Sequence, residues 1–401
     1  MSRYYFIENS FNWEEGSIKE IENQGDTFIL HLHFKPSAAS CPHCHSSKLH
    51  IKDYRDQNVL MGHWNSKSIY ARIHKKRYIC TGCHKTFYEE IPGIRRYQRR
   101  SNEVIHRIRQ SCAELMSFQA VARKHGVSVS TVIKYFDQFT FKRPEHLPEI
   151  LSLDEFRGNT HGQRYQVALN NPETHEILDI LPKRTTEAML LYFCQFPRKE
   201  RLKVKFVVMD LSSLFRKVVR IMFPCATIIG DRFHIQRLVV WALERVRKTV
   251  QNLFHEKRIY FKRNKHILNK NGKKLTAEEA VCLHEILKQS PKLQRAYALK
   301  EAFFNVFSMK ESGSVQVFLP QWLALVKESG LEEFKSVLQT FKDWKKEIVE
   351  GLTQPYSNGF TEGMNNKIKV LKRVAFGFRN FERFRSRILF LSNAKLNEKW
   401  T

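Results

Sequence analysis

Two apolar runs that each lead into a carboxylate, EILSLDEF (149–156) and RLKVKFVVMD (201–210), indicate the fold. The first run and the alternating segments GQRYQVALNN (162–171) and HEILDILPKR (175–184) predict three strands in hairpin order. Predicted helices and strands then alternate, which is typical of a mixed sheet flanked by helices. In chain order these later elements are the helix TTEAMLLYFCQF (185–196), the strand RLKVKFVVMD, the helix LSSLFRKVVRIMF (211–223) and the strand ATIIGD (226–231).

Two aspartates, Asp154 and Asp210, are placed where predicted strands emerge from this sheet. If the two strands are neighbours, the carboxylates lie a few ångströms apart and repel each other unless cations sit between them. Carboxylate oxygens are ligands that Mg²⁺ prefers, and two such ions can promote transfer of a phosphoryl group. The sequence therefore predicts a catalytic site for Mg²⁺ (or Mn²⁺) on Asp154 and Asp210.

Three nearby residues are assigned lesser roles. Glu155 is a second choice for the metal, because it points to the opposite side of the strand from Asp154. Asp231 ends another predicted strand and is expected to orient Arg232 or His234 beside the site, with direct metal coordination as the alternative. We expect His234 to pack at the start of a helix, with a phosphate contact as the alternative.

A third carboxylate is offered by the segment SNGFTEGMNNKIKVLKR (357–373). Helical spacing places Glu362 and Lys369 on one face, while Met364 and Ile368 lie on a neighbouring face that can pack on the sheet. Ser357 or Thr361 is the expected cap, which puts Glu362 in or near the first turn. We predict that Glu362 completes the metal site and that the cations beyond it, Lys369, Lys372 and Arg373, bind DNA. A surface helix with a solvated charge stripe is the alternative.

The charge balance also favours a polyanionic partner. Lys and Arg number 68 against 40 Asp and Glu among 401 residues, a net charge of +28. Double-stranded DNA is the expected partner, and a ribosome-associated or membrane-surface protein is the alternative. The N-terminus lacks the apolar segment of a signal peptide, and the apolar run LVVWAL (238–243) is too short to span a bilayer. A cytoplasmic location without membrane association is expected.

Two CxxC motifs predict a structural zinc site, since each turns two thiolates toward one point. The ligands are Cys41, Cys44, Cys80 and Cys83, and the alternating run IYARIHKKRYIC predicts that the second motif ends a hairpin. Two redox-active pairs are the alternative, but no strand-then-helix pattern follows either motif. Neighbouring histidines could substitute as ligands, although solvent exposure is the expected state of His43, His45 and His84.

The segment after this ribbon predicts a helix-turn-helix. Ala122, Gly126 and Val132 in MSFQAVARKHGVSVSTVIKYFDQF (116–139) have its spacing, and Ser128 or Ser130 can cap the second helix. Any small three-helix core can show the same spacing, which is the alternative. The residues predicted to meet a major groove are Ser130, Thr131 and Lys134, and those predicted to meet phosphates are Arg95, Arg96, Arg99 and Arg100.

Taken together, these stretches resemble the transposases of bacterial insertion sequences, in particular the ISL-three type of the DDE superfamily. The matching blocks are RIHKKRYICTGCHKTF, SLDEF, VVMDLSSLFRKVV, FPCATIIGDRFHI and SNGFTEGMNNKIKVLKRVAFGFRNFERFRSRILF. The resemblance implies a multidomain α/β protein with a zinc ribbon within residues 1–94, a helix-turn-helix over 95–145 and an RNase H-like catalytic domain over 146–401. It implies Asp154, Asp210 and Glu362 as the acidic triad, and the long gap before Glu362 implies a helical insertion at about 240–350.

The resemblance further implies binding to the ends of an insertion sequence, DNA cleavage, and joining of the freed 3′-hydroxyl to target DNA. A homodimer on DNA at the nucleoid is expected. Trp322 and Trp344 of the insertion are expected in the core, with stacking on a flipped base as the alternative. The rival functions are a non-catalytic DNA-binding regulator or inactive relic, a structure-specific nuclease, and a tyrosine or serine recombinase.

Overall fold

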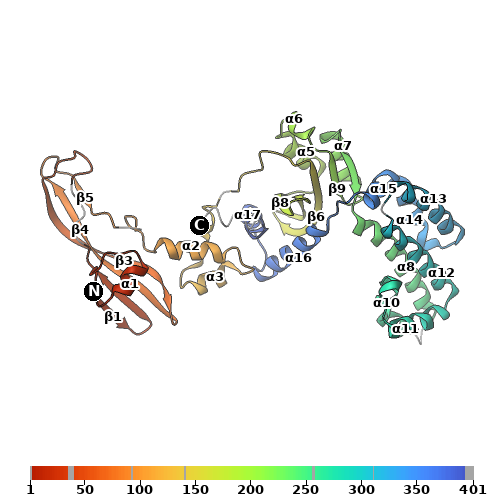
Figure 1. Ribbon diagram of the computed structural model, residues 1–401, viewed down its shortest axis with the longest axis horizontal. Coiled ribbons are helices and arrows are strands. Elements are labelled where there is room, and N and C mark those ends of the chain that lie inside the picture. Colours follow the sequence, from red (N-terminus) through yellow and green to blue (C-terminus); the bar gives the residue numbers. More distant parts are fainter. Residues whose placement is uncertain are drawn as a thin grey trace. The chain divides into compact units, whose positions relative to one another are not determined.

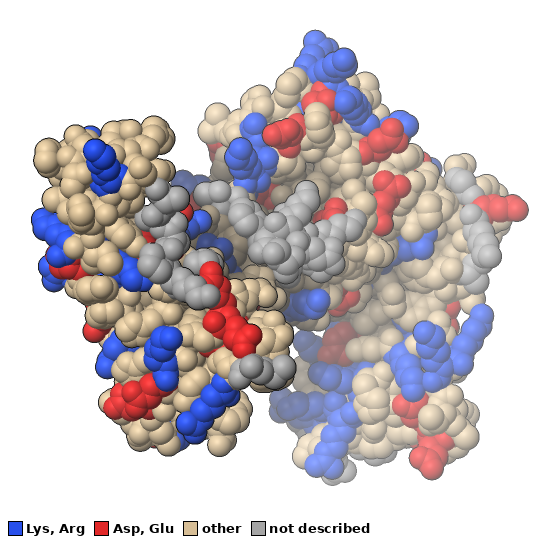
Figure 2. Space-filling model, turned by 60° about the vertical axis from the view of Figure 1, so that its left-hand side comes forward, with Lys and Arg blue, Asp and Glu red and all other residues tan. Residues whose placement is uncertain are grey.

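The computed structural model describes residues 2–34, 40–91, 94–139, 141–254, 258–309 and 311–392. The chain forms two compact units, one containing Met1–Phe141 and the other containing Lys142–Lys372 and Gly377–Asn393. Each unit has its own sheet and its own hydrophobic core (Figure 1). Lys and Arg side chains are spread over the surface of the described residues in Figure 2, as the net charge of +28 requires. No described helix is long and apolar enough to cross a membrane.

Two hairpins make the sheet of the first unit. β3 (Leu49–Trp64) and β4 (Lys67–Cys80) form a long antiparallel hairpin that ends at Cys80, as the alternating run predicts. β1 (Ile18–Gln24) and β2 (Thr27–Leu32) form the other, and β2 pairs with β4 in parallel. β5 (Thr86–Tyr88) also pairs with β4. The N-terminal hairpin, which was not predicted, thus belongs to the sheet that carries the cysteines, and Ile7 of α1 (Tyr5–Ser10) packs against the core of this unit.

Three helices follow the sheet, each begun by a serine that accepts a hydrogen bond from a backbone N–H of the first turn. They are α2 (Asn102–Ser111), α3 (Phe118–Lys124) and α4 (Val129–Phe136), with the caps Ser101, Ser117 and Ser128. Ala122 and Val132 are buried between them, and Gly126 has a φ of +57° in the turn between α3 and α4. The predicted helix-turn-helix is therefore formed, with Ser128 rather than Ser130 as the cap.

The sheet of the second unit has the order β10-β9-β6-β7-β8. β6 pairs with β7, and β7 with β8, in antiparallel fashion, whereas β9 is parallel to β6 and β10 is parallel to β9. This is the mixed topology of the RNase H-like fold. The strands are β6 (Ile150–Thr160), β7 (Gln163–Asn171), β8 (Glu176–Leu181), β9 (Phe206–Met209) and β10 (Thr227–Gly230).

Helices cover both faces of this sheet. Leu151 and Leu153 of β6 belong to the large core that also holds Met189 of α5 and Phe215 of α7. The intervening residues of β6 point to the other face, where α16 and α17 lie (Figure 1). The helices are α5 (Thr186–Cys194), α6 (Arg198–Arg201), α7 (Ser213–Met222), α16 (Gly359–Val374) and α17 (Phe381–Ser392).

A helical insertion separates β10 from α16, as predicted, although it begins at Arg232 and not near residue 240. Its last helix lies against the end of β10, where a Cβ added to Gly351 would collide with the carbonyl oxygen of Gly230. The helices are α8 (Arg232–Leu253), α9 (Arg258–Arg263), α10 (Lys265–Asn269), α11 (Ala277–Lys288), α12 (Pro291–Phe304), α13 (Ser312–Glu328), α14 (Lys335–Asp343) and α15 (Lys345–Thr353), with 3₁₀ turns at Gly272–Lys274, Asn305–Ser308 and Glu332–Phe334.

Candidate active site and zinc site

Asp154 and Asp210 are placed side by side by the pairing of two parallel strands. Leu153 of β6 pairs with Met209 of β9, and each aspartate is the next residue along its strand direction. Asp154 is not at the end of its strand, because β6 continues to Thr160 in the hairpin with β7; only its pairing with β9 ends there. Asp154 is 7% exposed, and burial together with the nearby Asp210 charge raises the pKa of Asp154 to about 7.

His234 lies between two carboxylates at the start of α8. Its Nδ1 is 2.8 Å from Oδ1 of Asp210 and 2.8 Å from Oδ2 of Asp231. Burial lowers the pKa of His234, but the interactions with Asp210 and Asp231 outweigh burial and raise the pKa to about 9. The Nδ1 nitrogen forms a hydrogen bond with Oδ2 of Asp231, and Oδ1 of Asp210 is held beside the same nitrogen as an ion pair. Asp231 also caps α8 by accepting from the N–H of Phe233.

Asp231 therefore orients His234, one of the two partners that the sequence suggested. Arg232, the other suggested partner, forms its hydrogen bonds elsewhere. The guanidinium of Arg232 donates to the carbonyl oxygens of Gly351 and Gln354, at the end of the insertion. Glu155, on the face opposite Asp154, forms an ion pair with Arg184 beside α7.

A polar row on α16 fixes this helix to the sheet. Asn365 donates from Nδ2 to Oδ2 of Asp154 over 2.7 Å, and Thr361 accepts from the Asn170 amide of β7 over 3.1 Å. At the start of the helix Asn358 accepts from the Ser152 hydroxyl of β6. Thr361 is thus inside the helix and facing the sheet, so the prediction that it caps α16 is wrong. The sequence analysis did not single out Asn365.

Glu362 occupies the first turn of α16, as predicted, and its side chain is exposed. Among the described residues, the groups of three or more ligand-type side chains are the four cysteines and the set of Asp210, Asp231 and His234; Asp154 and Glu362 belong to neither. Glu362 precedes Asn365 by three residues and so lies one turn of the helix away from the contact with Asp154. Met364 and Ile368 are buried as predicted.

The basic residues of α16 differ in their surroundings. Lys369 and Arg373 are exposed, and the Lys369 ammonium is 3.3 Å from Oδ1 of Asn366. Lys372 is partly buried and donates to the carbonyl oxygen of Arg157, and burial lowers the pKa of Lys372. Lys369 and Arg373 are therefore accessible to a ligand, whereas Lys372 already donates a hydrogen bond to the backbone of β6.

The donor set of this region fits a divalent cation. Asp154 and Asp210 supply carboxylate oxygens, the preferred ligands of Mg²⁺ and Mn²⁺. Oδ1 of Asp210 lies 2.8 Å from Nδ1 of His234, whose positive charge offsets part of the repulsion between the two carboxylates. Glu362 could add a third carboxylate from the helix above.

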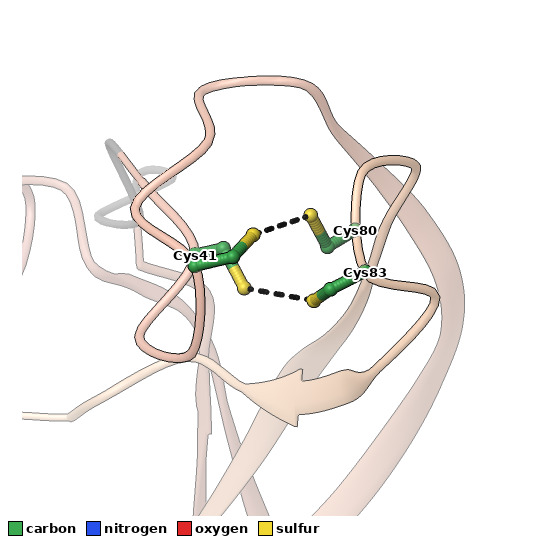
Figure 3. A group of neighbouring side chains, drawn as sticks. Cys41, Cys80 and Cys83 are labelled. Carbon is green, nitrogen blue, oxygen red and sulfur yellow. Dashed lines mark hydrogen bonds between the residues drawn. The ribbon is translucent and has the colours of Figure 1, made fainter.

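The four cysteines form a second, separate group at the open end of the β3–β4 hairpin, where β3 begins and β4 ends. Their Sγ atoms lie within 4.8 Å of one another, with 3.7 Å between Cys41 and Cys83 and 3.5 Å between Cys44 and Cys80 (Figure 3). A tetrahedral zinc with Zn–S bonds of about 2.3 Å requires thiolates about 3.8 Å apart. The backbone N–H of Cys83 lowers the pKa of the Cys80 thiol to about 6, which favours the thiolate.

The two cysteine knuckles have the same backbone geometry. His45 and His84, each directly after the second cysteine, have φ values of +57°, and each donates its N–H to the carbonyl of the first cysteine. These histidines and His43 are exposed and lie outside the thiolate group. The residues present form a Cys₄ site for structural Zn²⁺.

The predicted DNA-facing residues of α4 lie on its outer side. Ser130 and Lys134 are exposed, Thr131 is half-buried, and the Ser128 hydroxyl lies 2.9 Å from both the Ser130 and the Thr131 hydroxyl. Val132 and Phe136 fill the opposite, buried face. Side chains on the outer face of the second helix are those that a helix-turn-helix presents to the major groove.

The tryptophans of the insertion are core residues, as expected. Trp322 is 1% exposed and donates its indole N–H to the carbonyl of Leu299, and Trp344 lies under the guanidinium of Arg216 at 3.2 Å. Neither is placed to stack on a base. An exposed tryptophan of this region, Trp241, lies on α8 beside Arg237.

Three family models match the chain in order. They are the zinc finger of transposases IS204/IS1001/IS1096/IS1165 over residues 37–83, the helix-turn-helix domain of transposase family ISL3 over 89–140, and the ISL3 DDE transposase over 151–388. The transposase for insertion sequence element IS1001 of Bordetella parapertussis is 25% identical over 415 residues, covering 97% of this chain and 98% of the relative. The transposase for IS1557 of Mycobacterium tuberculosis is 24% identical over 257 residues, 57% of each chain.

A protein of Lactococcus lactis named ATP-dependent protease is 35% identical over 127 residues, which cover 32% of this chain and 39% of that protein. This match spans a minor part of both chains, and the present sequence has no G-x-x-x-x-G-K-[ST] motif for nucleotide phosphates. The other matches agree with the fold and with the side-chain groups. Because the ISL3 DDE model alone spans residues 151–388, more than half of its length, this chain belongs to the ISL3 family of DNA transposases.

Proposed function

We propose that the protein cleaves DNA at the ends of its insertion sequence and joins the freed 3′-hydroxyl to target DNA, with Asp154, Asp210 and Glu362 as metal ligands. The observation that carries this proposal is the juxtaposition of Asp154 and Asp210, which follow the last paired residues of two adjacent parallel strands. Two carboxylates in this arrangement repel each other unless a cation lies beside them. His234 supplies part of that charge.

Glu362 is proposed as the third ligand because of its position on α16. The helix is held to the sheet by Asn358, Thr361 and Asn365, and Asn365 binds Asp154 directly. Glu362 is one turn before Asn365, at the end of the helix where the backbone N–H groups favour a bound anion. Lys369 and Arg373 follow on the exposed side, where they can bind DNA phosphates.

When bound at the carboxylates, Mg²⁺ or Mn²⁺ would activate the attacking oxygen and stabilise the leaving oxygen of an in-line displacement at phosphorus. The residues of the chain contribute placement and charge. Asn365 and the backbone N–H of Glu155 hold the two oxygens of Asp154, over 2.7 Å each, and thereby fix the direction of the carboxylate. His234 and Asp231 hold Asp210 against the start of α8. No serine, tyrosine or cysteine nucleophile is required.

We assign end recognition to residues 95–145 and phosphoryl transfer to 146–401, with the zinc ribbon within residues 1–94. The proposed contacts of the first part are Arg95, Arg96, Arg99, Arg100, Ser130, Thr131 and Lys134, and those of the second are Lys369, Lys372 and Arg373. Lys372 would exchange its hydrogen bond to the Arg157 carbonyl for one to a phosphate. Two copies acting on paired ends would form a homodimer on DNA at the bacterial nucleoid in the cytoplasm.

The decisive experiment is a strand-transfer assay on DNA that carries the sequences flanking the gene, with and without Mg²⁺. Wild type should cleave and join, and Asp154→Asn, Asp210→Asn and Glu362→Gln should each abolish both steps while still binding the ends. Glu382→Gln is the matched control, because Glu382 is likewise an exposed acidic residue in the first turn of a helix, α17.

Other outcomes separate the rival functions. Binding without cleavage by wild type would indicate a regulator or relic, and cleavage without joining would indicate a nuclease. A covalent protein–DNA adduct would establish a serine or tyrosine recombinase. Cleavage by Glu362→Gln at the wild-type rate would remove Glu362 from the site but leave Asp154 and Asp210 in it.

A further inference from the structure

The loop of residues 95–100, RRYQRR, is a rigid basic turn between the sheet and α2. At one end Ile94 is buried in the core of the first unit and pairs with Ile91. At the other end the N–H of Leu60 in β3 donates to the carbonyl of Arg99, and the N–H of Ser101 donates to the carbonyl of Leu60. Both ends of this loop, which we call the arginine loop, are therefore fixed to the sheet.

Gln98 ties the inside of the arginine loop together. Its side-chain oxygen accepts from the N–H of Arg95 over 2.8 Å, and its Nε2 donates to the Arg100 carbonyl and to Oδ1 of Asn102. From β3, Gln57 donates its Nε2 to the Gln98 carbonyl over 2.6 Å. A loop held by so many internal hydrogen bonds presents its other side chains in fixed directions.

Tyr97 is the aromatic residue of the arginine loop and is more exposed than its neighbour Tyr88. It is 72% exposed and has a φ of +63°, a left-handed conformation that is unfavourable for a residue with a Cβ. The Arg96 guanidinium lies 4.8 Å from the centroid of the Tyr97 ring and 5.0 Å from the centroid of the Tyr88 ring. An exposed ring in a strained conformation contributes little to the free energy of folding, which favours a role for Tyr97 in binding a ligand.

The charges around Tyr97 identify that ligand as a polyanion. Arg95, Arg96 and Arg99 are exposed and surround the ring along the chain. A cleft of about 740 Å³ on one side of the loop is lined by Arg55, Lys75, Tyr88, Arg96, Tyr97, Arg99 and Arg100 among others. The acidic residues that line the clefts beside the loop are themselves bound, Asp56 to His74 and Glu103 to Arg107.

A second cleft of about 740 Å³ connects the arginine loop to the helix-turn-helix. Arg95, Arg96 and Tyr97 form part of its lining, and Lys134 and Gln138 at the end of α4 form another part. Since α4 is the helix that faces the major groove, the loop meets the same duplex next to it. The groove adjacent to a major-groove site is the minor groove, which attracts arginine and admits side chains that wedge between base pairs.

We propose that Tyr97 inserts into the minor groove beside the α4 site, wedging between two base pairs while the arginines of the loop bind the flanking phosphates. The inference rests on duplex DNA binding by the helix-turn-helix and goes beyond it, since it assigns a second reading element that senses groove width and the ease of unstacking. Steps that unstack easily, such as TA and CA, are the preferred targets. Bound DNA is bent away from the loop.

Binding of full-length, zinc-loaded protein to the terminal sequences flanking its gene tests the proposal without any cleavage. 2-Aminopurine is placed at successive positions of the duplex, since its fluorescence rises when the base unstacks, and end-to-end energy transfer reports the bend. Wild type should raise the fluorescence at one step beside the α4 site and shorten the end-to-end distance. Absence of both signals in a bound complex would overturn the wedge.

Tyr97→Gly is the key variant, because glycine accepts a φ of +63° without strain and the loop should keep its fold. Its melting temperature should equal or exceed that of wild type, while the fluorescence rise and the bend disappear and affinity falls about tenfold. Tyr97→Phe should retain all three, because the ring and not the hydroxyl is used. Unchanged fluorescence, bend and affinity in Tyr97→Gly would leave the loop as a phosphate contact and refute the insertion.

Tyr5→Ala is the control for loss of an exposed tyrosine in the same unit, since Tyr5 is 41% exposed and lines neither cleft. It should bind and bend DNA as wild type does. The outcome is independent of the catalytic proposal, because a protein with an inactive metal site would still give every signal in this assay.

Discussion

The side-chain amide of Asn365 donates a hydrogen bond to Oδ2 of Asp154 over 2.7 Å, linking residues 211 positions apart in the sequence. Through this contact the helix that carries Glu362 is aligned with the strand that carries Asp154. The second oxygen of Asp154 accepts from the N–H of Glu155, so both oxygens of the carboxylate have a defined direction. Asn365 is in our interpretation a positioning residue for the metal site.

Asn365→Ala should therefore lower DNA cleavage by about 10- to 100-fold, the usual cost of losing a group that orients a metal ligand. The Mg²⁺ concentration for half-maximal activity should rise, which a general loss of stability would not produce. Asn366→Ala is the control, since Asn366 is the exposed neighbour on the same helix. Equal Mg²⁺ dependence in both variants would show that Asn365 does not act through Asp154.

Removal of zinc should unfold the two cysteine knuckles at the open end of the β3–β4 hairpin, because these short loops bury little apolar surface of their own and metal binding supplies their folding free energy. Cys44→Ser is the informative variant, since Cys44 is exposed and its loss disturbs little packing. We expect about one zinc per chain in wild type and a loss of most of it in Cys44→Ser, measured by elemental analysis. Cys194→Ser, an exposed cysteine of the second unit, should keep its zinc.

Gly351→Ala should destabilise the second unit by about 1–3 kcal/mol, because the added Cβ would collide with the Gly230 carbonyl and force α15 away from β10. Thermal unfolding is the measurement. Gly363→Ala is the matched control within a helix, since nothing lies within 4 Å of its added Cβ. That control should be neutral or gain up to about 1 kcal/mol of helix stability, and an equal loss in both variants would contradict the packing argument.

Trp322→Ala should cost about 3–5 kcal/mol, the range for truncating a large buried aromatic side chain. Trp241→Ala, which removes a ring that is 49% exposed, should change the free energy of unfolding by less than about 0.5 kcal/mol. Denaturant unfolding of the two variants gives the comparison. A small effect of Trp322→Ala would mean that the core of the insertion is packed differently from the structure.

Glu8 gives the first unit a dependence on acid. Its buried carboxylate accepts from the N–H groups of Ile18 and Gly16; burial raises the pKa of Glu8, but these hydrogen bonds outweigh it and the pKa lies below 4.5. A lowered pKa stabilises the fold above pH 4.5, and this contribution is lost as the pH falls through the folded-state pKa. The melting temperature of Glu8→Gln should fall below that of wild type at pH 7 and approach it near about pH 3. Glu20→Gln, an exposed change on β1, should match wild type at both pH values.

The local pattern of apolar and polar residues was sufficient to predict many of the strands and helices of the second unit. The strand runs ending near Asp154 and Asp210 are strands of one sheet, and the apolar face of α16, with Met364 and Ile368, is buried on it. Alternating and helical periodicity report which side of an element is buried, and both aspartates stand out as carboxylates after apolar runs. The zinc ligands were equally visible, because the thiolate spacing is itself the signal.

Contacts between distant segments were not visible in the sequence. The parallel pairing of β2 with β4 joins two hairpins, and no local pattern specifies which strand edges meet. Asn365 looks like any polar residue of a basic helix until the fold brings it to Asp154. The continuation of β6 to Thr160 was missed for a similar reason, since its pairing with β7 outlasts its apolar run. The exposed ring of Tyr97 depends on a backbone angle that composition does not reveal.

The hydrogen bonds of Arg232 have a consequence for how such enzymes change over time. Arg232 is the first residue of α8, the first helix of the insertion. Its guanidinium donates to the carbonyls of Gly351 and Gln354, at the C-terminal end of α15, the last helix of the insertion. The insertion therefore departs from the sheet and returns to it at a single point. A module with adjoining ends can be shortened, enlarged or exchanged without rerouting the strands that hold Asp154 and Asp210. The same sheet can thus carry different helical insertions at this junction.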